Sequence, residues 1–260
     1  MSKNHFIAIF VSLVIFLGLW LGFDRVPGKQ KDIEKSRSLN IEITGEDNIL
    51  KNAMQQLSSD NRAIIEALQQ DLEKETTDST KVEPYKALAS AWYQFESPAA
   101  SAIYADKVAA IVNDAEAWSI AGTTYTLCLQ NVKEDNLRSF CSKRALAAFE
   151  KSLSIDPSNI ETRINQALVY VEYPLKDEPM KGILMLRELN GKYPENVAVL
   201  NQLARLALQT NQTDKAIERL EKSVSLEPEN NQTICLLAAA YDQAGDKDKA
   251  SFYNNKCNIK

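Results

Sequence analysis

The hydrophobic pattern of the chain begins with an uncharged run and continues with helical periodicity. Residues Phe6–Phe23 are almost wholly apolar, and a helix of this length is roughly 27 Å long, enough to cross a bilayer. No face of the run is polar, and no small-residue pattern like that of a signal-peptide cleavage site ends it. We therefore expect residues 1–23 to form a short tail and an uncleaved, single-pass transmembrane anchor.

Residues 24–44 are charged, contain Pro27-Gly28 and are predicted to form a linker. Residues 45–80 are predicted to be a helical segment, with helices over 46–57 and 59–75 and a polar break at 76–80. Apolar residues recur at helical spacing along these helices, at Leu50, Leu57, Ile64, Leu68 and Leu72. This 50–72 stripe has two possible uses: packing on the rest of the chain, or self-association as a short coiled coil.

The pattern of residues 81–260 repeats with a period of about 34 residues. The clearest unit starts at Val197, has small and large apolar residues on two successive helical faces, and ends at a proline; these positions are Leu200, Leu203, Ala204, Ala207, Ala216, Leu220 and Pro228. The next unit starts at Asn231 and carries similar residues at the same offsets, including Leu237, Ala238, Tyr241 and Ala250. Small residues suit close helix crossings, and proline ends a helix.

This arrangement resembles the tetratricopeptide repeat, a hairpin of two helices. The resemblance implies about four units, approximately 82–114, 115–159, 160–196 and 197–230, with a final partial unit at 231–260. The expected fold is all-α: an N-terminal transmembrane helix followed by an α-solenoid. Such hairpins stack because none buries its apolar face alone. By the family's groove offsets, the residues expected to line a partner-binding groove are Ser119, Thr123, Ile164, Leu168, Asn201, Arg205, Leu208 and Asp242.

Composition argues against chemistry at a catalytic site. The chain has a single histidine, His5, and it lacks a phosphate-binding glycine loop, a G-x-S-x-G motif and a C-x-x-C motif. We expect no enzyme activity, no cofactor and no metal site. The net charge of −5 argues against a nucleic-acid partner, which would require a basic surface.

Two features give opposing predictions for the side of the membrane. Five Lys and Arg residues follow the anchor between Arg25 and Arg37, which favours a cytoplasmic domain. The four cysteines, Cys128, Cys141, Cys235 and Cys257, fall as two pairs, each roughly level across a predicted hairpin. Two disulfides or four buried thiols both fit this placement. Because disulfides persist in oxidising compartments, the pairs favour an exported domain, periplasmic in a bacterium, and we lean toward that side.

The chain is therefore expected to be a membrane-tethered adaptor that binds a protein segment in its groove. It looks like bacterial inner-membrane proteins that carry one anchor and a tetratricopeptide domain, a group that includes assistants of envelope complex assembly, translocation and cytochrome c maturation. The alternative is a structural module that forms homo-oligomers through the 50–72 stripe. The anchor at residues 6–23 is the expected membrane contact.

Overall fold

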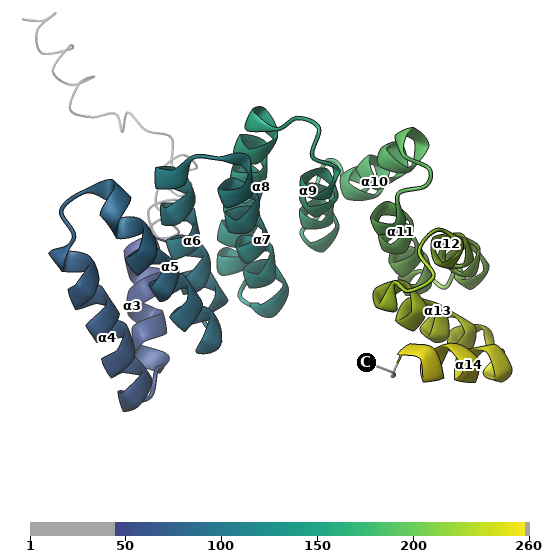
Figure 1. Ribbon diagram of the computed structural model, residues 1–260, viewed down its shortest axis with the longest axis horizontal. Helices are drawn as coiled ribbons and strands as arrows, with labels where there is room; N and C mark the ends of the chain where they lie inside the picture. Colours follow the sequence, from purple (N-terminus) through teal and green to yellow (C-terminus); the bar gives the residue numbers. More distant parts are fainter. Residues whose placement is uncertain (1–44, 258–260) are drawn as a thin grey trace, which may run out of the picture. The chain divides into compact units, whose positions relative to one another are not determined.

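The computed structural model describes residues 45–257, and the regular structure within this range is entirely α-helical (Figure 1). Its helices are α3 (Glu46–Gln56), α4 (Ser59–Lys74), α5 (Asp78–Gln94), α6 (Pro98–Val112), α7 (Ala115–Asn131), α8 (Asp135–Ile155), α9 (Ile160–Glu172), α10 (Lys181–Lys192), α11 (Val197–Gln209), α12 (Thr213–Leu226), α13 (Asn231–Ala244) and α14 (Lys247–Cys257). The predicted all-α solenoid is confirmed for these residues.

The chain divides into two compact units at Asn48, and the fold described below belongs to the second, from Ile49 onward. The predicted anchor at 6–23 and the linker at 24–44 lie outside the described residues. Between residues 45 and 257 no helix combines the length and the apolar character that a bilayer span needs.

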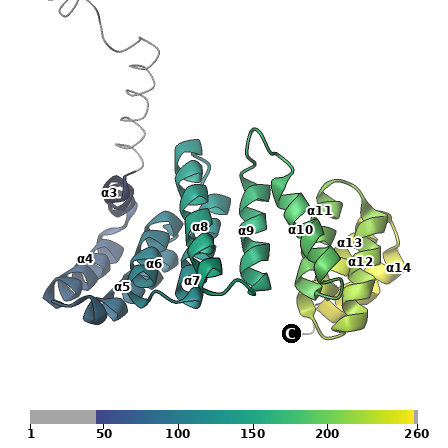
Figure 2. The same ribbon diagram turned by 90° about the horizontal axis from the view of Figure 1, so that it is seen from above.

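From α4 onward, each helix of the second unit packs on its neighbours in chain order (Figures 1 and 2). From α5 onward they form hairpins, which we describe by a first and a second helix: α5 with α6, α7 with α8, α9 with α10, α11 with α12, and α13 with α14. First helices also contact the first helix of the next hairpin, as α7 does with α9 and α11 with α13. The apolar core is thus shared between neighbouring hairpins.

The first helices α7, α9, α11 and α13 begin at matching caps. Asp114, Asn159, Asn196 and Asn230 each accept, through a side-chain oxygen, the backbone N–H three residues ahead, at distances of 2.7, 2.9, 3.0 and 3.1 Å. In the last three, the cap follows a proline by two residues. Proline stops the preceding helix, and the cap, typically about 1 kcal/mol, starts the next one. This local signal sets the length of the turn between hairpins.

Helices α3 and α4 use their apolar stripe inside the chain. Leu57, Leu68 and Leu72 pack against a buried cluster that includes Leu88 and Trp92 of α5. The prediction was wrong for Ile64, which is 47% exposed, whereas Ile65 is fully buried in its place. Since Leu68 and Leu72 keep their predicted contact, the difference on α4 is confined to this one position. The polar break is also shorter than predicted, since α5 begins at Asp78.

Two glycines mark places where helices approach closely. A Cβ atom on Gly122 of α7 would lie 2.6 Å from two ring carbons of Phe149 on α8. A Cβ atom on Gly182 of α10 would overlap the carbonyl oxygen of Ala167 and lie 2.8 Å from the backbone nitrogen of Val171, both on α9. A clash with backbone cannot be relieved by a side-chain rotation, so α9 and α10 require glycine at this crossing.

We predict that Gly182→Ala lowers the free energy of unfolding by about 1–3 kcal/mol, because the added methyl group forces α9 and α10 apart. Gly191→Ala is the matched control, since it lies on the same helix and a Cβ atom there would have no neighbour within 4 Å. The control is expected to be neutral or slightly stabilising. Urea unfolding followed by circular dichroism measures both, and equal midpoints for the two variants would refute the close crossing.

Candidate functional site

Two adjoining hollows meet on α7 and form one groove, which we call the α7 groove. The first, of about 460 Å³, is lined by residues of α5, α6 and α7; the second, of about 570 Å³, by residues of α7 and α9 and the turn before α9. Glu116 and Ile120 line both. Because they are four residues apart on α7, they lie one helical turn apart on the same face. Three successive first helices therefore contribute to this groove.

The floor of the α7 groove carries exposed apolar side chains. Ile120 is 55% exposed and Val112 is 41% exposed, while their neighbours Trp118 and Ala121 are buried in the core. Burial of apolar area contributes about 25 cal/mol per Å², so covering these side chains would favour association. Sequence reasoning missed Ile120. The available signal was an isoleucine beside the buried positions Trp118, Ala121, Gly122 and Tyr125 of α7.

Carboxylates surround this apolar centre. Glu116, Asp156 and Glu161 line the hollow between α7 and α9, and the described residues include no Lys or Arg in its lining. Hydrogen bonds from the hydroxyl and backbone N–H of Ser158, at 2.6 and 3.0 Å, hold the pKa of the Asp156 carboxyl below its usual range. Asp156 therefore keeps its negative charge at neutral pH. Lys86, in the first hollow, forms an ion pair with Glu83 at 2.8 Å.

The structure separates the eight predicted groove residues. Ser119 and Thr123 line the α7 groove. Arg205 and Asp242 are exposed on α11 and α13, and Leu168 and Leu208 are half-buried against neighbouring core clusters. The prediction was wrong for Ile164 and Asn201, because they are 3% and 2% exposed and a partner cannot reach them.

Contacts between successive first helices explain these two corrections. The Ser119 hydroxyl and the Thr162 hydroxyl lie within hydrogen-bond distance, at 3.1 Å, between α7 and α9. At the same offsets, Asn201 of α11 donates a 2.8 Å hydrogen bond from Nδ2 to the Thr233 hydroxyl of α13. Between them, Ile164 of α9 and Val199 of α11 belong to one apolar cluster. These positions join neighbouring hairpins, so they are consumed by stacking.

Comparison with known proteins supports the repeat where the pattern is clearest. Residues 197–230 match the tetratricopeptide repeat family. These are the residues of α11 and α12 with the turn that follows them. No curated protein matches the chain.

Solved structures of MamA proteins are similar to the chain. The crystal structure of a MamA protein is 19% identical, with 68% of this chain and 89% of that chain covered and a TM-score of 0.41. A MamA piece that begins at residue 41, from Desulfovibrio magneticus RS-1, is 19% identical, with 68% of this chain and 92% of that chain covered and a TM-score of 0.42.

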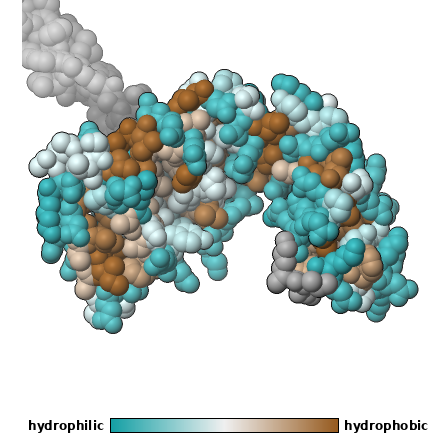
Figure 3. Space-filling model, viewed as in Figure 1, coloured by the Kyte–Doolittle hydropathy of each residue, from teal (hydrophilic) through white to brown (hydrophobic). Residues whose placement is uncertain are grey.

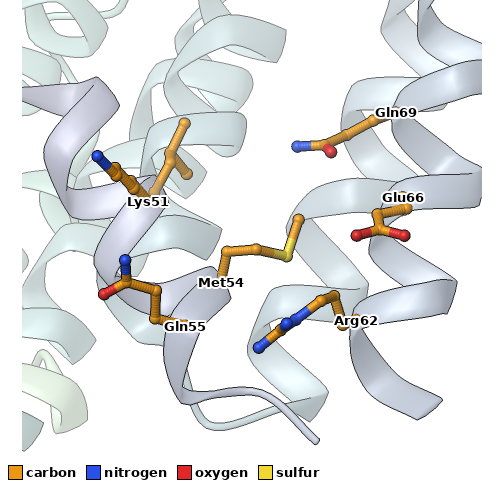
Figure 4. A pocket seen from close by; sticks show the side chains of 7 residues that line it. Lys51, Met54, Gln55, Arg62, Glu66 and Gln69 are labelled. Carbon is orange, nitrogen blue, oxygen red and sulfur yellow. The ribbon is translucent and has the colours of Figure 1, made fainter. Parts of the chain in front are cut away.

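Other surface features are smaller or more polar than the α7 groove. A hollow of about 360 Å³ lies between α3 and α4, where Met54 extends between the polar side chains of Lys51 and Gln55 on one side and Arg62, Glu66 and Gln69 on the other (Figure 4). At the start of α10, the N-cap residue Met180 and Leu184 are more than half exposed, at 53% and 57%. The face drawn in Figure 3 shows apolar groups set apart from one another in a largely hydrophilic surface.

The four cysteines are paired within two hairpins. Cys128 of α7 is bonded to Cys141 of α8, with 6.1 Å between their Cα atoms, and Cys235 of α13 is bonded to Cys257 of α14, with 5.0 Å. The first pair lies near the end of the lengthened α7–α8 hairpin. There the Arg138 guanidinium also donates to the carbonyl oxygens of Leu129 and Glu172, at 2.8 and 3.0 Å, and so joins the ends of α7 and α9.

The contact between α11 and α13 predicts a non-additive pair of substitutions. Thr233→Val should lower the free energy of unfolding by about 1–3 kcal/mol, because it leaves the buried Asn201 amide without its acceptor. Adding Asn201→Leu should recover most of this loss, because the double variant copies the apolar Ile164–Val199 contact. Denaturant unfolding of both single variants and the double variant measures the coupling. Strictly additive losses would contradict the proposed contact.

Proposed function

We propose that this protein is a noncatalytic scaffold, tethered to a membrane, that binds a segment of a partner protein in the α7 groove. The observation that carries the proposal is Ile120, an exposed apolar side chain at the centre of a groove built by three first helices. Stacked helical repeats provide extended surfaces of this kind for protein partners. The absence of the usual catalytic and phosphate-binding motifs from the sequence supports a binding role.

The uncharged run at 6–23 supports the membrane tether, and the charged residues 24–44 suit a linker between the tether and the helical array. The cellular setting we propose is the inner membrane of a bacterium, in envelope complex assembly, translocation or cytochrome c maturation. The net negative charge favours a protein partner over a nucleic acid.

We place the helical array on the exported side of the membrane. Its support is the pairing of all four cysteines within hairpins, a state that persists in oxidising compartments. The basic residues between Arg25 and Arg37 argue for the cytoplasm. Acidic residues are interspersed among them, at Asp32 and Glu34, and weaken that argument.

A photo-crosslinking amino acid at Thr123, which is exposed in the groove, tests the binding role. We expect it to yield a discrete crosslinked protein in native membranes, identifiable by mass spectrometry. The control carries the same group at Lys143, an exposed residue of α8 that does not line the α7 groove. Equal products at both positions, or none at Thr123, would count against the groove as the binding site.

Thiol labelling tests the side of the membrane. Because Cys128 and Cys141 are fully buried, the cells are quenched with acid and the protein is unfolded before labelling, and we expect both cysteines to resist a maleimide reagent until a reductant is added. Loss of this disulfide, which closes a loop of about 14 residues, should cost about 3 kcal/mol of stability on the chain-entropy estimate. Full labelling of both cysteines without reductant, together with protection from protease added outside the inner membrane, would place the array in the cytoplasm.

A further inference from the structure

The α7 groove also carries information on the chemistry of its partner. Three carboxylates, those of Glu116, Asp156 and Glu161, line the hollow between α7 and α9, where Ile120 is exposed. On the side of α9, an apolar side chain that covers Ile120 therefore meets only negative charges among the described residues, whereas Lys86 in the other hollow is paired with Glu83 at 2.8 Å. A segment with flanking carboxylates would be repelled there, because like charges brought together on binding reduce affinity.

Each of the three acidic residues has a local role, and each also leaves its carboxylate in the lining of the hollow. Glu116 and Glu161 lie in the first turns of α7 and α9, where the helix dipole stabilises a negative charge. Asp156 lies at the opposite kind of end, the C-cap of α8, where the dipole disfavours a negative charge. Hydrogen bonds from the hydroxyl and backbone N–H of Ser158 offset that repulsion, so Asp156 keeps its negative charge in the lining of the hollow.

The helix N-termini in the groove do not favour an anion. Asp114 and Asn159 cap α7 and α9, and their side-chain oxygens already occupy the backbone N–H groups of Ala117 and Thr162. An incoming carboxylate or phosphate would meet those caps together with Glu116 and Glu161. The charge of this hollow is therefore complementary to a cation.

We propose that the partner segment presents an apolar side chain to Ile120 between Lys or Arg side chains that approach Glu116, Asp156 and Glu161. This inference rests on the proposed function and adds the charge of the partner. The occupant is a cationic, apolar-anchored segment of another protein. The hydroxyl of Thr123, which is exposed in the same hollow, supplies a hydrogen-bonding group to its backbone.

Three fluorescein-labelled heptapeptides test the proposal by anisotropy with the full chain in detergent. They are Gly-Ser-Lys-Leu-Lys-Ser-Gly, the same peptide with Glu in place of both Lys, and the same peptide with Ser in place of Leu. We expect the Lys-Leu-Lys peptide to bind most tightly and to weaken as salt is raised. Equal binding of the Lys-Leu-Lys and Glu-Leu-Glu peptides, or no binding of either, would overturn the proposed charge.

Glu116→Gln combined with Glu161→Gln should lower the affinity for the Lys-Leu-Lys peptide by about three- to tenfold, the range for two exposed charge pairs. The control combines Glu150→Gln and Glu218→Gln, which change the net charge equally at exposed sites on α8 and α12. An equal loss of peptide affinity in both double variants would show that net charge alone causes the effect, and would overturn the inference. If crosslinking at Thr123 captures a partner whose bound segment is acidic, the scaffold stands and the charge assignment fails; if crosslinking itself fails, the proposed function fails first.

Discussion

The packing of each hairpin on the first helix of the next hairpin is the contact on which this structure depends. A single hairpin leaves one apolar face open, and only a neighbour can cover it. Ser119 with Thr162, Ile164 with Val199, and Asn201 with Thr233 make this contact at one repeated pair of offsets, with different chemistry each time. The polar pairs fix a partner by hydrogen bonding, and the apolar pair contributes burial. Substitutions there change the junction between hairpins.

The same contact decides what remains available to a partner. A first-helix residue that faces the next hairpin is consumed by stacking, as Ile164 and Asn201 are. Residues turned away from that junction stay open, and on α7 these include Ile120 and Thr123. The lengthened α7–α8 hairpin places this surface beside a rigid support, because Cys128–Cys141 and Arg138 hold its far end. The groove is thus formed by the α7 residues that the neighbouring hairpins leave exposed.

Periodicity predicted the helical elements well, because apolar spacing, prolines and Asx caps are local signals. It placed α3 and α4 closely and identified the turns at Pro157, Pro194 and Pro228. It did not determine which of two adjacent isoleucines faces the core. Ile65 is buried and Ile64 is exposed, because that choice depends on where α5 lies. Family offsets likewise overstated the open groove at Ile164 and Asn201, since the next hairpin covers them. Arg138, whose partners are backbone carbonyls on two helices, left no pattern in the sequence.

Neighbouring hairpins stabilise one another, and the α10–α11 junction is the most direct place to measure this stabilisation. There Leu186 and Leu189 of α10 share a core cluster with Val199 and Leu203 of α11. Amide hydrogen exchange of α11 and α12 can be compared between the full chain and a polypeptide of residues 197–260. We predict much faster exchange in the shorter polypeptide, because it lacks α10 and Val199 and Leu203 become exposed to solvent. Equal protection in both would contradict the claim and show that these hairpins are stable by themselves.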